Sequence, residues 1–172
     1  MVYALGSVQK IRVGVMKEGI QQVLIANRGE IAVRILRTLT ELSIRSVAVY
    51  PEDDASALHV LLADQSEQLE GTGAAAYLDI EQVIRVAKES GCDAVHPGYG
   101  FLSEKSALVS GLDQAGIAFV GPPARAIEVM GDKIASKALA ERAGVPTIPG
   151  FNEVLADAQR SEEHTSELQS PD

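Results

Sequence analysis

The sequence predicts an α/β domain in which helices cover both faces of a mostly parallel β-sheet. Two observations predict this fold class. Short β-rich segments alternate with longer segments of helical spacing along the chain. The strand segments are also continuously apolar, as expected for strands that are buried on both faces. Crossover helices between parallel strands then give a Rossmann-like domain of three layers.

Four strands and four helices are expected in this order of alternation. The expected strands are Gln22–Ala26, Ser46–Tyr50, Asp93–Val95 and Ile117–Val120. The expected helices are Glu30–Leu42, Ile80–Ser90, Glu104–Ala115 and Lys133–Ala143. The first helix repeats apolar residues at steps of three and four, so one face should pack on the sheet. For the second helix, Asp79 and Gln82 have the spacing of a capping box, and Gly91 should end it.

Composition and charge limit the possible function classes. The chain has 172 residues and a net charge of −9 without any block of Lys or Arg, so nucleic acid and anionic membranes are not expected partners. No apolar run approaches the roughly 20 residues of a membrane-spanning helix. The single cysteine, Cys92, cannot form an internal disulfide, and no cleavable leader is recognised. One soluble, cytoplasmic domain is expected.

Both ends of the chain differ from this domain pattern. Residues 1–20 show no period and are interpreted as an N-terminal extension; either they are a disordered arm, or translation begins at Met16. At the other end, Arg160–Ser170 is the translation of a widely used sequencing-library adapter, and Pro171 agrees with the next adapter base. We interpret residues 160–172 as an artefactual disordered tail whose deletion should leave thermal stability unchanged.

Two glycine-containing segments could bind a ligand. Asn27–Glu30 follows the first strand and opens a helix, where it could hold an anion or serve only as a structural turn. Gly71–Ala76 fits the pattern G-x-G-x-x-A. Dinucleotide binding requires this pattern at the strand-to-helix junction, but Tyr77 and Leu78 intervene before the next helix cap. A flexible loop of small residues is the favoured interpretation.

Two further segments carry unusual residues. His96–Glu104 is a loop rich in glycine and aromatic residues, of the kind that faces a ligand, with Ser103 and Glu104 as an ordinary helix opening. Cys92 and His96 lack a second pair at ligand spacing, so no zinc site is expected. Lys133 stands at a helix start, where the dipole disfavours a cation. It is either a phosphate-facing residue or a solvated lysine after a turn.

Three of these segments together resemble one family. The segments Val23–Arg37, Ala94–Glu104 and Phe119–Lys133 are similar to sequences that occur in the same order in biotin carboxylases. The resemblance extends over about residues 21–150. It implies that residues 21–130 are the N-terminal, pre-ATP-grasp domain and that residues 131–159 are the start of a truncated ATP-grasp domain.

The resemblance also implies a reaction, cofactors and partners. Members of the family use ATP and Mg²⁺ to activate bicarbonate as carboxyphosphate and then carboxylate biotin. The biotin is attached to a carrier protein or domain, and a carboxyltransferase completes the reaction on an acceptor that this sequence does not identify. By position, Lys133 matches the lysine that contacts the nucleotide, and Gly98 lies near the biotin entrance. Arg37 and Glu41 match residues at the dimer interface of bacterial members, so a homodimer is implied for the full-length enzyme.

Other features of the family have no counterpart in this sequence. The glycine-rich lid, the metal-binding acids and the bicarbonate-binding arginine lie further along the family's chain, so this chain alone is expected to be inactive. Two alternatives remain open. One is another ATP-grasp ligase of purine or carbamoyl-phosphate synthesis, which would not be expected to carry both Asn27–Glu30 and His96–Gly100. The other is a non-catalytic Rossmann-like nucleotide-binding module, which would need a glycine fingerprint after Ala26.

Overall fold

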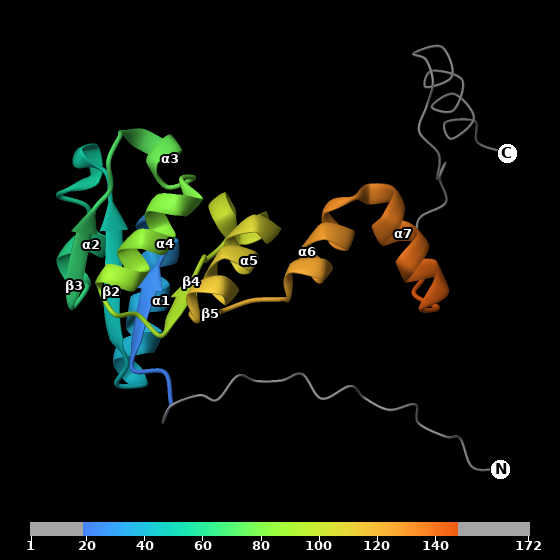
Figure 1. Ribbon diagram of the computed structural model, residues 1–172, viewed down its shortest axis with the longest axis horizontal. Helices are drawn as coiled ribbons and strands as arrows, with labels where there is room; N and C mark the ends of the chain where they lie inside the picture. Colours follow the sequence, from blue (N-terminus) through green and yellow to red (C-terminus); the bar gives the residue numbers. More distant parts are fainter. Residues whose placement is uncertain (1–18, 148–172) are drawn as a thin grey trace, which may run out of the picture. The chain divides into compact units, whose positions relative to one another are not determined.

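The computed structural model describes residues 19–147, and its first part is built on a five-stranded sheet (Figure 1). The strand order is β3-β2-β1-β4-β5, and every pair is parallel. Strand β1 is central, and β3 and β5 form the edges. The strands are β1 Gln22–Ile25, β2 Arg45–Tyr50, β3 Gln65–Gln68, β4 Ala94–His96 and β5 Ala118–Phe119. The predicted parallel sheet is confirmed.

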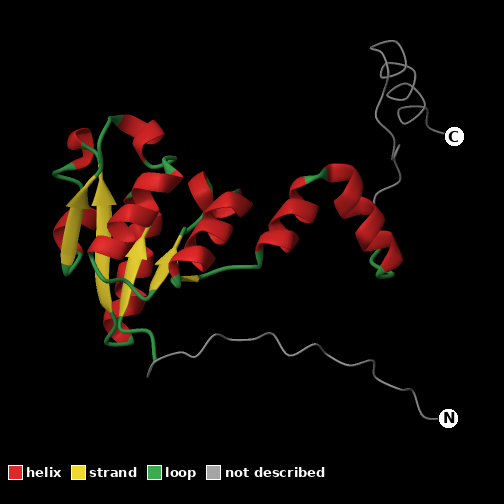
Figure 2. Cartoon of the chain, in the orientation of Figure 1, coloured by secondary structure: helices red, strands yellow, loops and turns green. Residues whose placement is uncertain are grey.

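Helices cover both faces of this sheet (Figure 2). On one face, helix α1 (Gly29–Glu41) buries Leu36 and Leu39 against Val23 and Ile25 of β1. On the other face, the opposite side chains of the strands form a larger core with α4 (Ile80–Glu89) and α5 (Ser106–Ala115). Because successive strand residues point to opposite faces, adjacent residues of β1 enter different cores. The three-layer arrangement predicted from the apolar strands is confirmed.

Several short elements were not predicted. Strand β3 has the sequence Gln-Ser-Glu-Gln and pairs only with β2, so it lacks the apolar run that marks the buried strands. The helices α2 (Leu58–Leu62), α3 (Gly73–Ala76) and α6 (Ala124–Gly131) are also additional. The expected flexible loop at Gly71–Ala76 is therefore wrong in part, since its last four residues form α3.

Two predicted helix starts have different outcomes. The Asp79 side chain accepts a hydrogen bond from the Gln82 backbone at 3.0 Å, which confirms the cap of α4. The Gln82 side chain does not complete a capping box, because it bonds to the backbone of Glu70 instead. For α5, the expected start at Glu104 is wrong. Residues Phe101–Glu104 form a 3₁₀ turn, and α5 begins at Ser106.

A second unit follows the sheet unit. The contacts within the chain divide it between Ala124 and Arg125, and we describe each unit by itself. Helix α7 (Lys133–Arg142) is capped by the Asp132 carboxylate, which accepts hydrogen bonds from the backbones of Ile134 and Ala135 at 2.8 and 2.9 Å. In residues 19–147 no helix has the length and apolarity needed to cross a membrane. Residues 1–18 of the predicted N-terminal extension lie outside the described residues, and so does the adapter-like tail.

Candidate functional site

The candidate site lies at the edge of the sheet where four of the parallel strands end. All five strands are parallel, so the segments that follow β1, β2, β3 and β4 leave the sheet at its carboxyl edge. This is the edge at which open α/β sheets bind ligands. We call residues 26–28, after β1, the Asn27 loop and residues 97–100, after β4, the Pro97 loop. Both belong to segments that the sequence singled out.

Asn27 joins these two loops. Its side chain is buried, and its amide donates hydrogen bonds to the carbonyl oxygens of Pro97 at 2.8 Å and Tyr99 at 2.9 Å. Its carbonyl oxygen accepts a hydrogen bond from the Arg28 backbone at 2.9 Å. The conformation of one loop therefore depends on the other. Of the two interpretations of Asn27–Glu30, the structural one accounts for Asn27 itself.

Gly98 is required by the same close approach. Its φ is +67°, and a Cβ atom there would lie 2.6 Å from Asn27 Nδ2 and 2.8 Å from Ile31 Cγ2. Any larger residue would push the Pro97 loop away from Asn27. The residue that the resemblance places near biotin thus also packs the two loops together. Tyr99, the next residue, is 80% exposed and so remains accessible to a ligand.

A polar cluster of four residues lies beside the Asn27 loop. Arg28 pairs with Asp54 at 3.1 Å, and Asp54 accepts a hydrogen bond from the Tyr77 hydroxyl at 2.8 Å. The His59 Nε2 atom lies 3.5 Å from the same hydroxyl. Tyr77 and His59 are almost fully buried. We call Arg28, Asp54, His59 and Tyr77 the Tyr77 cluster.

Burial shifts the titration of several groups near this edge. It lowers the pKa of His59, although the Asp54 carboxylate acts in the opposite direction. Burial also lowers the pKa of His96, whose Nδ1 accepts a hydrogen bond from the Gly98 backbone at 3.0 Å. A histidine that accepts a hydrogen bond at Nδ1 is neutral and carries its proton on Nε2. Burial thus disfavours the charged form of both imidazoles, and for His96 the hydrogen bond to Nδ1 acts in the same direction.

Sequence reasoning did not identify the Tyr77 cluster. Asp54, His59 and Tyr77 lie in three different segments, and none belongs to a motif with a fixed spacing. Asp54 follows β2, so its place after a buried strand was the one available signal. In the sequence, Tyr77 is notable only because it follows the G-x-G-x-x-A pattern and separates it from the next helix. In the structure, the Asp53 carboxylate accepts a hydrogen bond from the Gly73 backbone at 2.9 Å, where that pattern would hold a phosphate.

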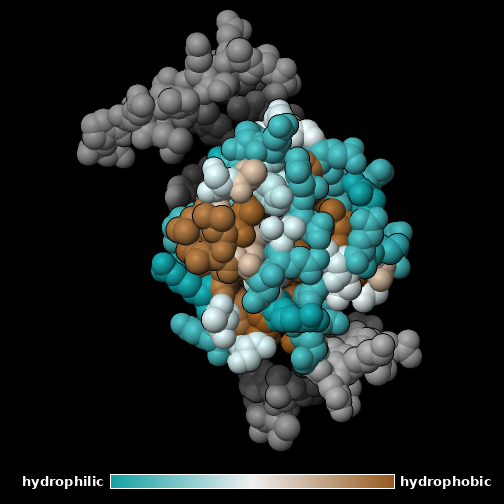
Figure 3. All heavy atoms as spheres, turned by 90° about the vertical axis from the view of Figure 1, so that its left-hand side faces the viewer, coloured by the Kyte–Doolittle hydropathy of each residue, from teal (hydrophilic) through white to brown (hydrophobic). Residues whose placement is uncertain are grey.

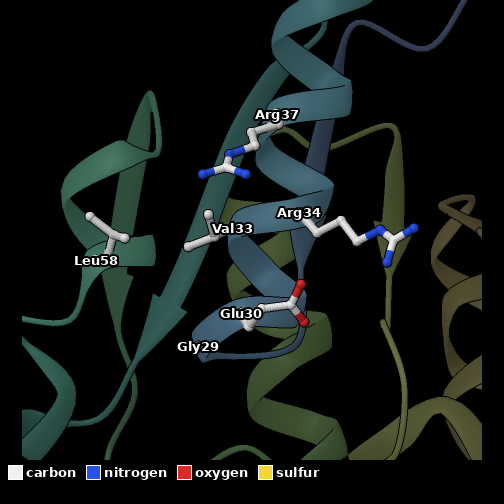
Figure 4. Close-up of a pocket in the computed structure, with 6 residues that line it drawn as sticks. All are labelled: Gly29, Glu30, Val33, Arg34, Arg37 and Leu58. Carbon is white, nitrogen blue, oxygen red and sulfur yellow. The ribbon is translucent and has the colours of Figure 1, made fainter.

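The other predicted site residues lie elsewhere. Arg37 and Glu41 are exposed on α1, and within residues 19–147 they form no ion pair with each other. Arg37 lines an open groove between α1 and α2 (Figure 4). The lining residues are Gly29, Glu30, Val33, Arg34, Arg37 and Leu58. Lys133 is the exposed first residue of α7 in the second unit.

An apolar surface adjoins the groove. Helix α2 exposes Leu58, Leu61 and Leu62, of which Leu61 is 71% exposed. Figure 3, which faces the side of the molecule where α2 lies, shows an apolar patch on that side.

Cys92 behaves as a buried core thiol. Its side chain packs in the larger core, and burial raises its pKa to about 11. Within residues 19–147, no three His, Cys, Asp or Glu side chains are grouped as metal ligands.

Comparison with known proteins gives the family of this fold and site. A family profile described as "Biotin carboxylase, N-terminal domain" matches residues 19–127. The chain is 48% identical over 142 residues to a biotin carboxylase of Halalkalibacterium halodurans, covering 82% of this chain and 31% of that protein. It is 47% identical over 150 residues to mitochondrial pyruvate carboxylase of Rattus norvegicus, covering 86% of this chain and 13% of that protein.

Solved structures agree with this assignment. The biotin carboxylase domain of a single-chain bacterial carboxylase superposes with a TM-score of 0.80 at 47% identity, covering 87% of this chain and 35% of that one. The biotin carboxylase domain dimer of Hydrogenobacter thermophilus 2-oxoglutarate carboxylase, solved with MgADP, ADP and bicarbonate, has a TM-score of 0.82 at 41% identity. It is covered to 34%, and this chain to 88%. The chain thus spans about a third or less of the relatives that it matches.

Proposed function

The chain belongs to the biotin carboxylase N-terminal domain family, and we propose that it is the N-terminal part of an ATP-dependent ligase that carboxylates carrier-bound biotin. The observation that carries the proposal is the family match over residues 19–127, which includes the Asn27 loop and the Pro97 loop. The structure joins these loops through Asn27 at the edge where α/β sheets bind ligands. The match favours biotin carboxylase over the other ATP-grasp ligases considered.

ATP, Mg²⁺ and bicarbonate are the proposed reactants and cofactors, with biotin as the carboxyl acceptor. A relative at 41% identity was solved with MgADP, ADP and bicarbonate, which supports the same set for this chain. When bound, ATP and Mg²⁺ supply an activated phosphoryl group and charge neutralisation. From this chain, Lys133 would contribute a cation toward the nucleotide phosphates. Asp132 supports this role because it caps α7, so the helix start does not depend on the lysine side chain.

The Pro97 loop is the proposed biotin-facing segment. Gly98 keeps the loop against Asn27, and Tyr99 beyond it is exposed. The carrier protein or domain and the carboxyltransferase are proposed partners on the basis of the family. A cytoplasmic location remains a prediction from the sequence. Since the chain spans about a third of the biotin carboxylases that it matches, we expect this chain alone to show no bicarbonate-dependent ATP hydrolysis in a phosphate-release assay.

The nucleotide role of Lys133 is tested in a protein extended by the remaining domains. Lys133→Gln removes a charge-assisted contact worth about 1.5–3 kcal/mol, so the KM for ATP should rise about ten- to a hundredfold. Stability should change little because Lys133 is exposed. Lys137→Gln, one helical turn further along α7, is the matched control. Equal small effects of both substitutions on the KM for ATP would contradict the assignment.

We also propose that Arg37 and Glu41 belong to a dimer interface. Both are exposed on α1, and a relative at 41% identity was solved as a biotin carboxylase domain dimer. In the extended protein, Arg37→Glu should lower the dimer fraction in sedimentation velocity, because it reverses a charge at the contact. Arg85→Glu, on α4, is a control because Arg85 pairs with Glu70 within the chain. An unchanged dimer fraction for Arg37→Glu would remove Arg37 from the interface.

A further inference from the structure

Tyr77 contacts groups that adjoin both loops of the site. The Tyr77 side chain is fully buried, whereas Tyr99 of the Pro97 loop is exposed at the surface. The Tyr77 hydroxyl meets Asp54, which holds Arg28 of the Asn27 loop. Its ring meets Phe101, the residue that follows the Pro97 loop.

The hydroxyl of Tyr77 acts through one carboxylate. Burial and the Asp54 carboxylate together raise the pKa of Tyr77, so the hydroxyl keeps its proton and donates a hydrogen bond to Asp54. The same carboxylate oxygen of Asp54 lies 3.1 Å from Arg28 Nη1. The Arg28 guanidinium is also 5.8 Å from the centre of the Tyr77 ring. The Arg28 guanidinium therefore contacts both the Asp54 carboxylate and the face of the Tyr77 ring, and these two groups are hydrogen-bonded to each other.

The ring of Tyr77 packs against a segment whose backbone conformation is energetically unfavourable. Gly98 and Gly100 both have a φ of +67°, and Phe101 has a φ of +46°. A positive φ is costly for a bulky residue and persists only where its surroundings enforce it. The Phe101 ring lies 5.5 Å from the Tyr77 ring, at 49° to it. Tyr77 is one of the core residues against which Phe101 packs, and this packing opposes relaxation of the segment.

We propose that Tyr77 is a positioning residue that holds the Asn27 loop and the Pro97 loop in one fixed arrangement. Its hydroxyl acts through Asp54 and Arg28, and its ring acts through Phe101. Together with the hydrogen bonds of Asn27, these contacts connect the two loops to each other by two separate routes. An effect of this positioning on biotin binding rests on the proposed function, whereas the positioning itself can be tested on this chain.

Tyr77→Phe separates the two actions, because it removes the hydroxyl and keeps the ring. Amide hydrogen exchange of the ¹⁵N-labelled chain reports each loop: the Arg28 amide bonds to Asn27 Oδ1, and the Gly98 amide bonds to His96 Nδ1. We expect both amides to exchange about tenfold faster, the effect of one lost buried hydrogen bond on local opening. The Asp93 amide, which bonds to Gln22 at the other end of the sheet, is the reference for global opening.

Tyr50→Phe is the matched control, since it removes a hydroxyl at the end of β2 that makes no hydrogen bond within residues 19–147. It should leave the exchange of both loop amides unchanged relative to the Asp93 amide. The proposal is overturned if Tyr77→Phe leaves the loop amides unchanged, or if it accelerates loop and reference amides by the same factor. Asp54→Asn, which keeps an acceptor for Tyr77 but removes the charge, should accelerate the Arg28 amide.

Steady-state kinetics of the extended protein distinguish positioning from a general loss of structure. Tyr77→Phe should raise the KM for free biotin about three- to tenfold, with a smaller effect on kcat, because misplaced loops weaken binding before chemistry. A lower kcat with an unchanged KM for biotin would contradict the positioning role. If the unsubstituted extended protein showed no biotin-dependent turnover, the proposed function would fail, and the exchange result would still decide the role of Tyr77.

Discussion

The two units of the chain differ in how completely they bury their own apolar side chains. The sheet unit has a core on each face, and its loops are joined by buried hydrogen bonds. In residues 125–147, Ile127 alone is buried, and α7 buries no residue. Four large apolar side chains there are 39–65% exposed: Met130, Ile134, Leu139 and Val145. An isolated helix of ten residues is marginal in water, so the stability of α7 depends on packing against other residues.

This difference separates the two parts of the proposed site. The Pro97 loop, which we propose to face biotin, stands on a unit that carries its own core. Lys133 stands on a helix whose apolar residues are still exposed. We infer that the geometry of the Pro97 loop is already established in this chain. The nucleotide contact that we propose for Lys133 therefore starts from a less completely packed helix.

The same leucine truncation should destabilise the sheet unit much more than the second unit. Leu36 on α1 is 3% exposed, so Leu36→Ala should lower the free energy of unfolding by about 2–5 kcal/mol. Leu139 on α7 is 41% exposed, so Leu139→Ala should change it by less than about 0.5 kcal/mol. Urea unfolding followed by circular dichroism measures both. A cost for Leu139→Ala as large as that for Leu36→Ala would show that α7 is packed in this chain.

A smaller effect is expected at the loop junction of the sheet unit. Gly98→Ala places a Cβ atom 2.6 Å from Asn27 Nδ2 at a positive φ, so it should lower the free energy of unfolding by about 2–3 kcal/mol. Gly116→Ala is the control, because Gly116 also has a positive φ but no atom within 4 Å of its Cβ position. It should cost about 1 kcal/mol. Equal costs in urea unfolding would mean that the two loops separate without penalty.

The smallest effect concerns acid, and it too should be confined to the sheet unit. Burial lowers the pKa of His59 and His96 below 6.5, and residues 125–147 contain no histidine. The unfolded state therefore binds more protons just below pH 6.5. The stability that these residues contribute is present above that pH and is lost as the pH falls. Each histidine contributes at most about 1.4 kcal/mol per pH unit.

Two measurements check this sign. Free energies of unfolding between pH 7 and pH 5 should fall with the pH, and the imidazole signals of His59 and His96 in NMR should titrate below their ordinary pKa. Carboxylates also titrate toward the lower end of this range, so the slope just below pH 6.5 is the informative one. An increase of stability on acidification to pH 6 would show that one imidazole is charged in the folded state.

The sequence by itself determined the layers of the sheet unit. Apolar runs predicted β1, β2, β4 and β5, and helical spacing predicted α1, α4, α5 and α7 with ends correct to within two residues. These features are local, because burial on both faces writes an apolar run into the strand itself. Strand β3 was not predicted, because it is stabilised by pairing with β2 and a polar edge strand has no apolar run. The resemblance of the Asn27 and Pro97 segments to biotin carboxylases likewise required only the sequence.

Only the tertiary structure decided how the site is held. Asn27 and Tyr99 are 72 residues apart in the chain, and Tyr77 and Asp54 are 23 apart. No periodicity relates such pairs, because they meet only when parallel strands bring their carboxyl ends to one edge. Gly98 illustrates the division. The sequence marked it as a loop glycine, and the fold showed that the Asn27 amide occupies the space that a side chain would need.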